Sequence, residues 1–444
     1  MRGEEQKLAP RLTPHVSPLT EPPPLSLYIH LPWCVRKCPY CDFSSFESRE
    51  GVPEEAYVAA LLKDLEAALP LIWGRKVVSI FMGGGTPSLF SARSIDTLLT
   101  QVRTLLPVEA HAEITLEANP GTAEAQKFAD FRAAGVNRLS LGIQSFNPRH
   151  LRALGRIHDD REARVAVELA LRNFDNVNLD LMYALPEQSM AEALADIREA
   201  VSFGPQHISA YHLTLEPNTV FYNQPPSLPD DDMSASMQEA VEAELAGAGY
   251  EHYETSAFAK KRSPLPNPLP HAGEGANESL RDFRVNRCRH NLNYWTFGDY
   301  LGIGAGAHGK LTLHPQGVGR GCKADKSATT TLHYRVLRQV RHRQPKTYME
   351  LALAGNALEE ERTVPPDELP FEFMMNALRL TEGFPASLFS ARTGLSLAAV
   401  LPLLEEAQRR GLIERDALHI RPTLLGRRFL NDLLQLFLPE SAQP

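Results

Sequence analysis

The sequence has little cysteine for its length: 444 residues contain 5 Cys, and 3 of these lie between Cys34 and Cys41. So few cysteines exclude a small protein held together by disulfides. No run approaches the roughly 18 consecutive apolar residues of a membrane span, and the N-terminal MRGEEQKLAPRLTPHVSPLTEPPP lacks the apolar core of a signal peptide. We therefore expect a cytoplasmic protein without an integral membrane segment, in which thiols stay reduced and a tight Cys group favours a metal site.

The chain also lacks an excess of basic residues, since 46 Lys and Arg stand against 54 Asp and Glu, which gives a net charge of −8. An acidic balance gives no support for nucleic acid as a partner. Hydrophobic residues make up 43% and charged residues 23%, which is typical of a folded globular protein. The length favours two or three domains.

Short β-rich runs alternate with amphipathic helical patterns from Leu25 onward. The first predicted helix begins near Pro53, with Glu54 and Glu55 in its first turn, and its apolar residues recur every four positions. Strict alternation of strand and helix predicts parallel βαβ units, in an incomplete barrel or a doubly wound sheet. The predicted strands cover residues 27–31, 77–82, 113–117, 138–143, 177–182 and 207–213.

Composition changes divide the chain into five regions. Residues 1–24 contain six prolines and predict a disordered lead, and residues 256–287 form a proline-rich insertion or loop. The barrel is expected over 25–255, a connecting region over 288–366, and a C-terminal helical domain over 367–444. The order of helices and a hairpin in the last region resembles a winged helix. Its 8 Lys and Arg against 10 Asp and Glu argue against DNA binding, so we expect it to pack or to dock a partner.

The strongest chemical signal is HLPWCVRKCPYCDF at residues 30–43, directly after the first predicted strand. Cys34, Cys38 and Cys41 form a C-x3-C-x2-C pattern, and three thiolates from one loop suit an iron-sulfur cluster or zinc. Structural zinc normally takes four ligands, and His30 is the candidate for the fourth. Three ligands on a four-iron cluster would instead leave one iron open.

This pattern after the first strand resembles the radical S-adenosylmethionine (SAM) superfamily. The resemblance implies a [4Fe-4S] cluster on the three cysteines, with SAM bound at the open iron and cleaved to a deoxyadenosyl radical by an electron from the cluster. It also implies a partial (β/α)6 TIM-like barrel with ligands at the carboxyl ends of the strands. It extends over roughly 25–438, apart from the proline-rich stretch near 261–287.

Further polar residues match the coproporphyrinogen dehydrogenase-like branch of that family. They lie in the GGGTP turn after the second predicted strand and in LEANP, GIQSF, LGRIHD and NLDLMY. Taken singly, such strand-end residues are typical of caps and salt bridges. By resemblance the candidate SAM contacts are Tyr28, Gly84, Gly85, Thr86, Glu117, Gln144, Arg156 and Asp180.

Two features separate the subfamilies of this branch. Porphyrinogen-oxidising members have a further Cys two positions after the third ligand, where this chain has Phe43. The segment HNLNYW at 290–295 resembles the HNxxYW signature of HemW-type haem chaperones. Imidazole is a good haem ligand and aromatic rings can stack on a macrocycle, which makes His290 a candidate haem contact. His207, His212 and His308 compete with it, and a buried His beside aromatic residues is the alternative interpretation.

GIGAGAHG at 302–309 contains GxGxxG but continues into a strand-like run, which excludes a dinucleotide fingerprint and leaves a glycine-rich wall beside a flat ligand. Cys288 and Cys322 are interpreted as free thiols. The resemblance as a whole implies a haem chaperone that delivers haem to respiratory or other acceptor haemoproteins. The alternative is oxygen-independent coproporphyrinogen III dehydrogenase of porphyrin biosynthesis, so the sequence leaves catalysis uncertain. The C-terminal helices are candidates for contact with an acceptor or a second subunit, and a homodimer stays open.

Overall fold

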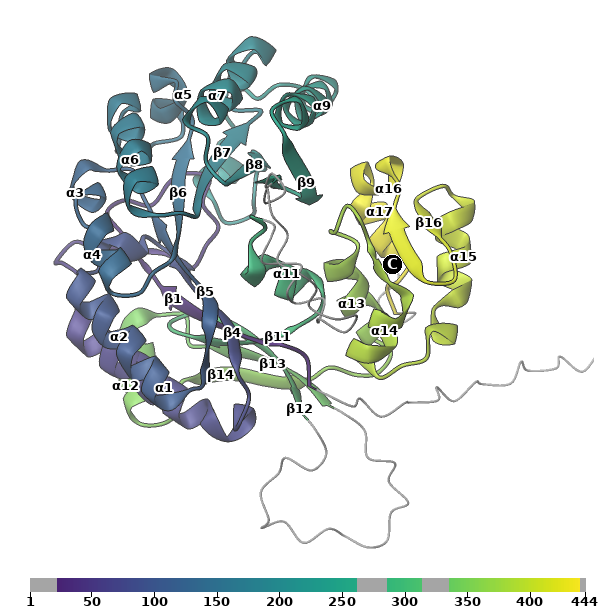
Figure 1. Cartoon of the computed structure of the whole chain (residues 1–444), viewed down its shortest axis with the longest axis horizontal. Helices are drawn as coiled ribbons and strands as arrows, with labels where there is room; N and C mark the ends of the chain where they lie inside the picture. The colour runs from purple at the N-terminus through teal and green to yellow at the C-terminus, as the bar shows by residue number, and fades with distance from the viewer. Residues whose placement is uncertain (1–21, 262–285, 314–334, 440–444) are drawn as a thin grey trace, which may run out of the picture. The chain divides into compact units, whose positions relative to one another are not determined.

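The computed structural model describes residues 22–261, 286–313 and 335–439. These form two compact units (Figure 1). The larger contains Pro23–Thr312 and Val336–Thr363, and the smaller begins at Val364. Most of the predicted lead and of the proline-rich insertion lies outside the described residues, as does Cys322. No described helix is both long and apolar enough to cross a lipid bilayer.

The larger unit is built on one sheet of twelve strands. Its centre consists of parallel strands that neighbour one another in chain order, which confirms the predicted series of six βα units. They are β1 (Leu25–Leu31), β4 (Val77–Gly84), β5 (Val108–Ala118), β6 (Arg138–Gln144), β7 (Val177–Tyr183) and β8 (His207–His212). In the described residues the strand order is linear, with β14 (Leu358–Thr363) and β9 (Tyr250–Glu254) at its edges, so the barrel is open.

The helices that connect these strands begin where the sequence supplies caps. Capping boxes satisfy free N–H groups in the first turns of α6 (Asp160–Asn173) and α7 (Met190–Phe203). They are formed by Asp159 with Glu162 and by Ser189 with Glu192. The connecting helices are α1 (Glu54–Ile72), α2 (Ala92–Leu105), α3 (Thr122–Ala125), α4 (Phe128–Ala133), α5 (Pro148–Ala153), α6 (Asp160–Asn173) and α7 (Met190–Phe203). After β8 follow α8 (Val220–Asn223) and α9 (Asp231–Gly247).

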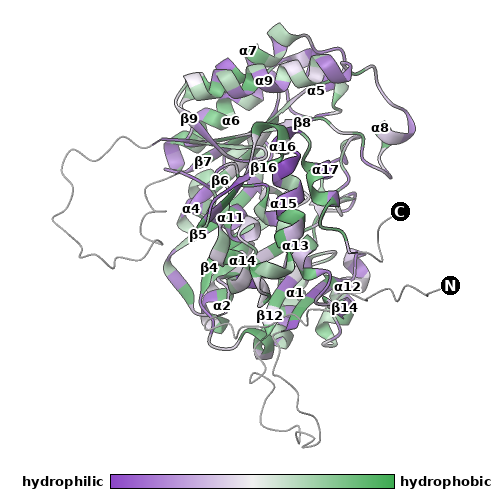
Figure 2. Cartoon of the chain, turned by 90° about the vertical axis from the view of Figure 1, so that its right-hand side faces the viewer, coloured by the Kyte–Doolittle hydropathy of each residue, from purple (hydrophilic) through white to green (hydrophobic). Residues whose placement is uncertain are grey.

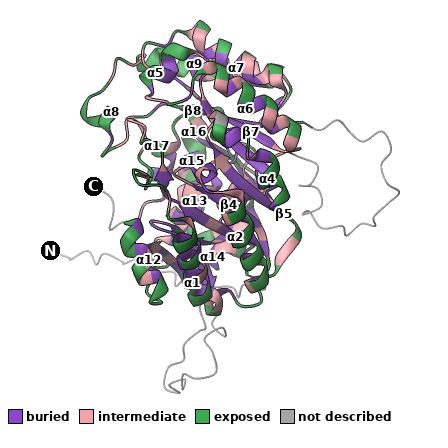
Figure 3. Cartoon of the chain, turned by 90° about the vertical axis from the view of Figure 1, so that its left-hand side faces the viewer, coloured by how far each residue is buried: buried purple, intermediate pink, exposed green. Residues whose placement is uncertain are grey.

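The core of the larger unit lies on both faces of the sheet. Strand β1, with the sequence LSLYIHL, is buried at six of seven positions, as expected for a parallel strand covered on both sides. Figure 3 shows buried strands in the sheet and exposed residues on helices such as α2 and α4. Figure 2 shows that helices such as α7 and α9 carry both hydrophobic and hydrophilic residues, so each has one face to bury.

The sheet extends beyond the predicted barrel in both directions, which corrects two expectations. Ala257–Lys260 forms strand β10 rather than the start of a loop, and it pairs antiparallel with β8. The connecting region was expected over 288–366, but its described residues up to Thr363 supply strands β11 to β14 to the same sheet. The added elements are β9 (Tyr250–Glu254), α11 (Arg289–Trp295), β11 (Asp299–Ile303), β12 (His308–Leu313), β13 (Arg335–Arg341), α12 (Pro345–Leu353) and β14 (Leu358–Thr363).

A buried ion pair attaches this late segment to the first helix. Asp64 of α1 lies 3.3 Å from the guanidinium of Arg341 in β13 and accepts a 2.9 Å hydrogen bond from the hydroxyl of Tyr348 in α12. A buried charge needs a partner of opposite charge and further hydrogen bonds. Neither partner can therefore be lost without leaving an uncompensated charge, and residues 336–363 stay with the barrel.

The smaller unit combines short helices with a three-stranded sheet in the order β15-β17-β16. Strands β16 and β17 form the predicted hairpin. In the core of the smaller unit, the ring of Phe373 packs edge to face against the rings of Phe384 and Phe389. The predicted last helix is divided at Phe429 into α16 and α17. The elements are α13 (Leu369–Ala377), β15 (Phe384–Pro385), α14 (Ala386–Thr393), α15 (Leu401–Arg409), β16 (Ile413–Arg415), β17 (His419–Pro422), α16 (Leu424–Arg428) and α17 (Leu430–Gln435).

Candidate functional site

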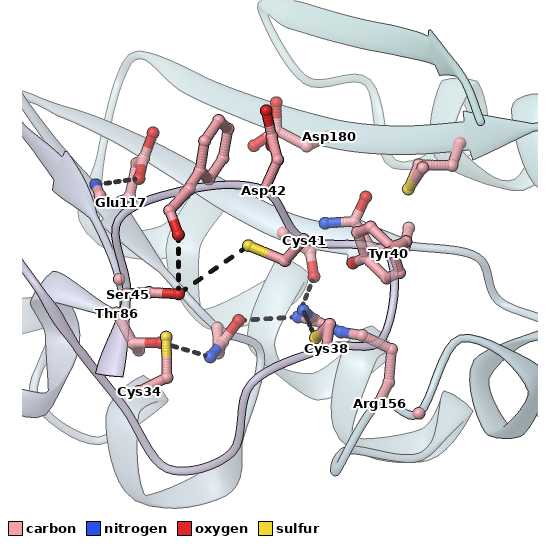
Figure 4. Close-up of a pocket in the computed structure, with 18 of the residues that line it drawn as sticks. Cys34, Cys38, Tyr40, Cys41, Asp42, Ser45, Thr86, Glu117, Arg156 and Asp180 are labelled. Atoms are coloured by element: carbon pink, nitrogen blue, oxygen red, sulfur yellow. Dashed lines mark hydrogen bonds between the residues drawn. The ribbon is translucent and has the colours of Figure 1, made fainter. Parts of the chain in front are cut away.

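The three clustered cysteines lie on the loop that follows β1. The short strands β2 (Trp33–Cys34) and β3 (Phe46–Glu47) pair and close this loop, and inside it Cys41 N donates to Cys38 O at 3.1 Å. Lys37 Nζ donates to the carbonyl of Phe43 at 2.9 Å, which also fixes the loop. The three thiols are free, partly buried and line one cleft of about 360 Å³ (Figure 4).

These thiols suit a metal cluster with three protein ligands. Burial raises the pKa of Cys34 and Cys41, and the charges of neighbouring thiols raise it further, so the thiolates need a cation to hold them. Among the described residues, no group of three or more His, Cys, Asp and Glu side chains is already arranged around one metal position. The fit of the three thiols to a cluster rests on their sulfur chemistry and on their shared place in the cleft.

His30, the candidate for a fourth zinc ligand, already has partners for both ring nitrogens. Nδ1 lies 3.0 Å from the hydroxyl of Tyr28, and Nε2 lies 2.8 Å from the carbonyl of Ser44. Coordination of a metal would break one of these bonds in a buried position, which is costly. This geometry favours three sulfur ligands over a four-ligand zinc site.

The GGGTP turn after β4 forms one wall of the cleft. Gly84 has φ +112°, and a Cβ placed there would lie 2.3 Å from the ring of His30; a Cβ at Gly85 would lie 2.5 Å from the carbonyl of Trp33. Only glycine allows the turn to approach the cysteine loop this closely. Thr86 belongs to the same wall, and its Oγ1 accepts a 3.0 Å hydrogen bond from Asn119 Nδ2.

Two acidic side chains line the cleft from strands β5 and β7, which lie on either side of β6. Glu117 accepts a 3.2 Å hydrogen bond from Gly84 N, and Asp180 accepts hydrogen bonds from Ser140 and Asn178 at 2.9 and 2.8 Å. Burial, followed by the charge of Asp180, raises the pKa of Glu117 to about 8. Burial likewise raises the pKa of Asp180. Two close carboxyl groups with raised pKa values form a site that would favour a bound cation or an ammonium group.

Glu117→Gln is expected to flatten the pH dependence of stability of the protein before it is loaded with cluster and cofactor. The pKa of Glu117 is about 8 in the folded chain against 4.5 for the unperturbed group. The protonated carboxyl of Glu117 therefore stabilises the folded chain fully below the pKa that Glu117 has in the unfolded chain. This stabilisation is lost as the pH rises through the pKa that Glu117 has in the folded chain. We expect urea unfolding of the wild type to show a loss of about 1 to 3 kcal/mol from this group between about pH 5 and 8.

Asp42→Asn is the matched control for this experiment because it removes an exposed carboxyl that lines the same cleft. It should keep the wild-type slope. Equal slopes for the wild type and Glu117→Gln would show that Glu117 ionises normally in the folded chain.

Arg156 connects the cysteine loop to the opposite wall. Its guanidinium donates to Asn119 Oδ1 and to the carbonyl of Gly142, both at 2.7 Å, and lies 3.6 Å from Cys38 Sγ. Gln144, at the end of β6, has φ +67° and also lines the cleft. A left-handed backbone at a residue other than glycine is typical of a functional site.

The structure brings together seven of the eight predicted SAM contacts, since only Tyr28 is missing from the lining of the cleft. Tyr28 lies behind the wall, and burial followed by the charge of Glu117 raises its pKa. The cleft is also lined by four residues that were not predicted from the sequence: Asn119, Tyr40, Met182 and Tyr211. Asn119 belongs to the LEANP motif, so its place in the cleft could have been predicted from that motif. No sequence pattern distinguishes the other three from ordinary aromatic and apolar residues.

The candidate haem histidines lie in different environments. His290 and His207 are each 1% exposed, and both ring nitrogens of each are hydrogen-bonded. His212, at the end of β8, contributes to the lining of the cleft, whereas exposed His308 does not. Ligation of haem by His290 would break a buried hydrogen bond, so this geometry gives the prediction no support.

The glycine-rich segment 302–309 is also explained by packing. A Cβ at Gly302 would lie 2.0 Å from the carbonyl of His308, and one at Gly304 would lie 2.3 Å from the carbonyl of His30. These glycines let β11 and β12 approach each other and the end of β1. None of them lines the cleft, so the expected glycine-rich wall beside a ligand is not found there.

Comparisons with known proteins agree with this geometry. Residues 28–200 match the Radical SAM superfamily and residues 364–429 match the HemN C-terminal domain. The chain is 47% identical over 422 residues to "Heme chaperone HemW" of Escherichia coli (strain K12), with 94% of this chain and 99% of the relative covered. The chain belongs to the HemW family. This confirms the resemblance drawn from the cysteine loop and the HNxxYW segment.

Other relatives of this HemW-family chain support the assignment. The HemW proteins of Haemophilus influenzae and Mycobacterium tuberculosis (strain H37Rv) are 47% and 34% identical, over 94% and 88% of this chain and 99% and 91% of theirs. The solved coproporphyrinogen III oxidase (HemN) of Escherichia coli has a TM-score of 0.72 at 23% identity, over 94% of this chain and 90% of that one. At that identity the likeness establishes the shared fold, including the C-terminal unit, and leaves the alternative dehydrogenase activity without support.

Proposed function

We propose that this HemW-family chain is a haem chaperone that carries a [4Fe-4S] cluster and SAM, binds haem and delivers it to acceptor haemoproteins in the cytoplasm. The observation that carries the proposal is the cleft itself. Three free thiols, the glycine turn and two carboxyl groups with raised pKa values line one pocket in a chain related to haem chaperones over nearly its full length.

Each part of the cleft has a residue suited to a part of the cofactors. Cys34, Cys38 and Cys41 would hold three irons of the cluster, and the fourth iron would be left for SAM. The glycine turn would admit the methionyl group close to the backbone. Glu117 and Asp180 would bind its polar groups, and Arg156 would neutralise charge beside Cys38. When bound, cluster and SAM supply one-electron chemistry.

A flat apolar ligand such as haem could bind to exposed hydrophobic side chains at the rim of the same cleft. Four of the large hydrophobic side chains that remain exposed line it: Val35 (50%), Phe43 (60%), Ile157 (48%) and Tyr211 (41%). Exposed apolar groups gathered around a concave site indicate ligand binding. Arg36 lines the cleft as well and would pair with a haem carboxylate.

Phe43 gives this part of the proposal its test. Phe43→Asp should weaken haem binding by about 10-fold or more, because it replaces an apolar contact by a charge that haem would desolvate. The measurement is a haem titration of anaerobically reconstituted protein, followed by the Soret band. The matched control is Trp73→Asp, which changes an aromatic residue that is 81% exposed and does not line the cleft.

Haem affinity that is the same in Phe43→Asp as in wild type would place haem elsewhere on the chain. The same preparation should be assayed with coproporphyrinogen III. Conversion to protoporphyrinogen IX at an enzymatic rate would overturn the chaperone proposal in favour of the dehydrogenase.

A further inference from the structure

Helix α11, which carries the HNxxYW segment, is built into the inner face of the sheet. It lies against β1, β4 and β11 (Figure 1). Its N-terminus is capped by Glu113 of β5, whose carboxylate accepts hydrogen bonds from Arg289 N at 3.2 Å and His290 N at 3.1 Å. Cys288 Sγ donates to the same carboxylate at 3.4 Å. A carboxylate at this end satisfies N–H groups that lack a partner within the helix.

The side chains of α11 join a closed hydrogen-bond network with two strands. Ser79 Oγ lies 3.0 Å from Nδ1 of His290 and 2.7 Å from Ser26 Oγ. Asn293 Nδ2 donates to Ser26 Oγ at 2.8 Å, which returns the network to the helix, and Nε2 of His290 lies 2.9 Å from the hydroxyl of Tyr294. The His and Tyr of the signature, and Asn293 between them, therefore already have protein partners.

The ring of His290 also supports the aromatic layer beneath the cleft. Its centroid lies 5.1 Å from that of Phe81, and Phe81 stacks on Tyr28 at 6.4 Å. The hydroxyl of Tyr28 bonds His30, and His30 bonds the carbonyl of Ser44 in the cysteine loop. A series of ring contacts and hydrogen bonds thus connects His290 to the base of the loop that carries the three thiols.

The same layer touches the glycine turn. A Cβ at Gly83 would lie 2.9 Å from the ring of Phe81, and one at Gly84 would lie 2.3 Å from the ring of His30. Because the two rings fill the space behind the turn, a displacement of either ring would move one wall of the cleft. Packed cores transmit such shifts since they contain few voids.

We propose that His290 is a positioning residue, which holds the Phe81, Tyr28 and His30 rings under the cysteine loop and the glycine turn and thereby sets the affinity for SAM. This inference rests on the proposed function, because it takes the cleft as the cluster and SAM site. Burial lowers the pKa of His290 to about 3, so the ring is neutral at pH 7. A neutral imidazole has one donor and one acceptor, which matches its two hydroxyl partners.

The test measures SAM and haem binding separately on full-length, anaerobically reconstituted protein. SAM affinity is read from the change that SAM causes in the electron paramagnetic resonance spectrum of the reduced cluster, and haem affinity from the Soret titration. His290→Ala should raise the dissociation constant for SAM by about 10-fold, the effect of losing one buried polar and ring contact, and leave that for haem unchanged. His290→Gln, which restores hydrogen-bonding groups, should recover most of the SAM affinity.

His150→Ala separates positioning from a general loss of stability. His150 is buried, with 0% exposed, and lies outside the network described above. Its loss should lower the melting temperature and leave SAM affinity at the wild-type value. If His290→Ala does not fold, Phe81→Leu removes the ring beneath Tyr28 and should weaken SAM binding in the same direction.

Three results would be decisive against the proposal. SAM affinity unchanged in His290→Ala would overturn it, as would failure of His290→Gln to recover any of the loss. Loss of the haem spectrum in His290→Ala with SAM affinity intact would make His290 a haem ligand. A wild-type protein that takes up neither iron nor SAM would instead contradict the proposed function, so the two failures are distinguishable.

Discussion

Cys38→Ala is expected to abolish assembly of the iron-sulfur cluster. Two thiolates remain in the variant, and they cannot fix a four-iron cluster that three were needed to hold. The guanidinium of Arg156, which lies 3.6 Å from Cys38 Sγ in the wild type, would also lose this sulfur as a hydrogen-bond partner. The measurement is iron and acid-labile sulfide content after anaerobic reconstitution, together with the visible absorption of the cluster.

Cys288→Ala is the matched control. Cys288 is a buried free thiol whose sulfur bonds Glu113 and does not line the cleft. This variant should retain the full iron content. Stoichiometric zinc without iron in the wild type would contradict the cluster assignment, and retention of a complete cluster by Cys38→Ala would exclude Cys38 as a ligand.

Gly84→Ala is expected to cost the folded protein roughly 2 to 4 kcal/mol and to prevent SAM binding. At φ +112° an alanine is strained, and its Cβ would lie 2.3 Å from the His30 ring. The ring has no free direction to move because both its nitrogens are hydrogen-bonded. The variant therefore deforms either the glycine turn or the support of the cysteine loop. Urea unfolding measures the first effect and SAM titration the second.

Gly247→Ala provides the comparison for this prediction. Gly247 lies in α9 without a positive φ, and a Cβ there would meet nothing within 4 Å. The substitution should be neutral or slightly stabilising because alanine favours a helix. If Gly84→Ala unfolds at the wild-type urea concentration and binds SAM normally, the close approach of turn and loop is not required.

The sequence by itself determined the features that depend on neighbouring residues. The six parallel strands follow from apolar runs with helical patterns between them, and the capping boxes at Asp159 and Ser189 are local signals. The three cysteines lie within a stretch of eight residues, so their spacing alone placed them on one loop. The family could be identified from these motifs because each is a short run of adjacent residues, and the motifs follow one another along the chain in the order that the family shows.

Only the tertiary structure decided which distant residues meet. The pair Asp64 and Arg341, 277 positions apart, attaches a late segment to the first helix, and no local pattern announces that contact. His290 was chosen from the sequence for its chemistry, yet its burial and its bond to Ser79 depend on a strand 211 positions away. Residue type and spacing define which ligands a side chain could bind. Its burial and the hydrogen-bond partners supplied by distant strands decide whether it is available to bind them.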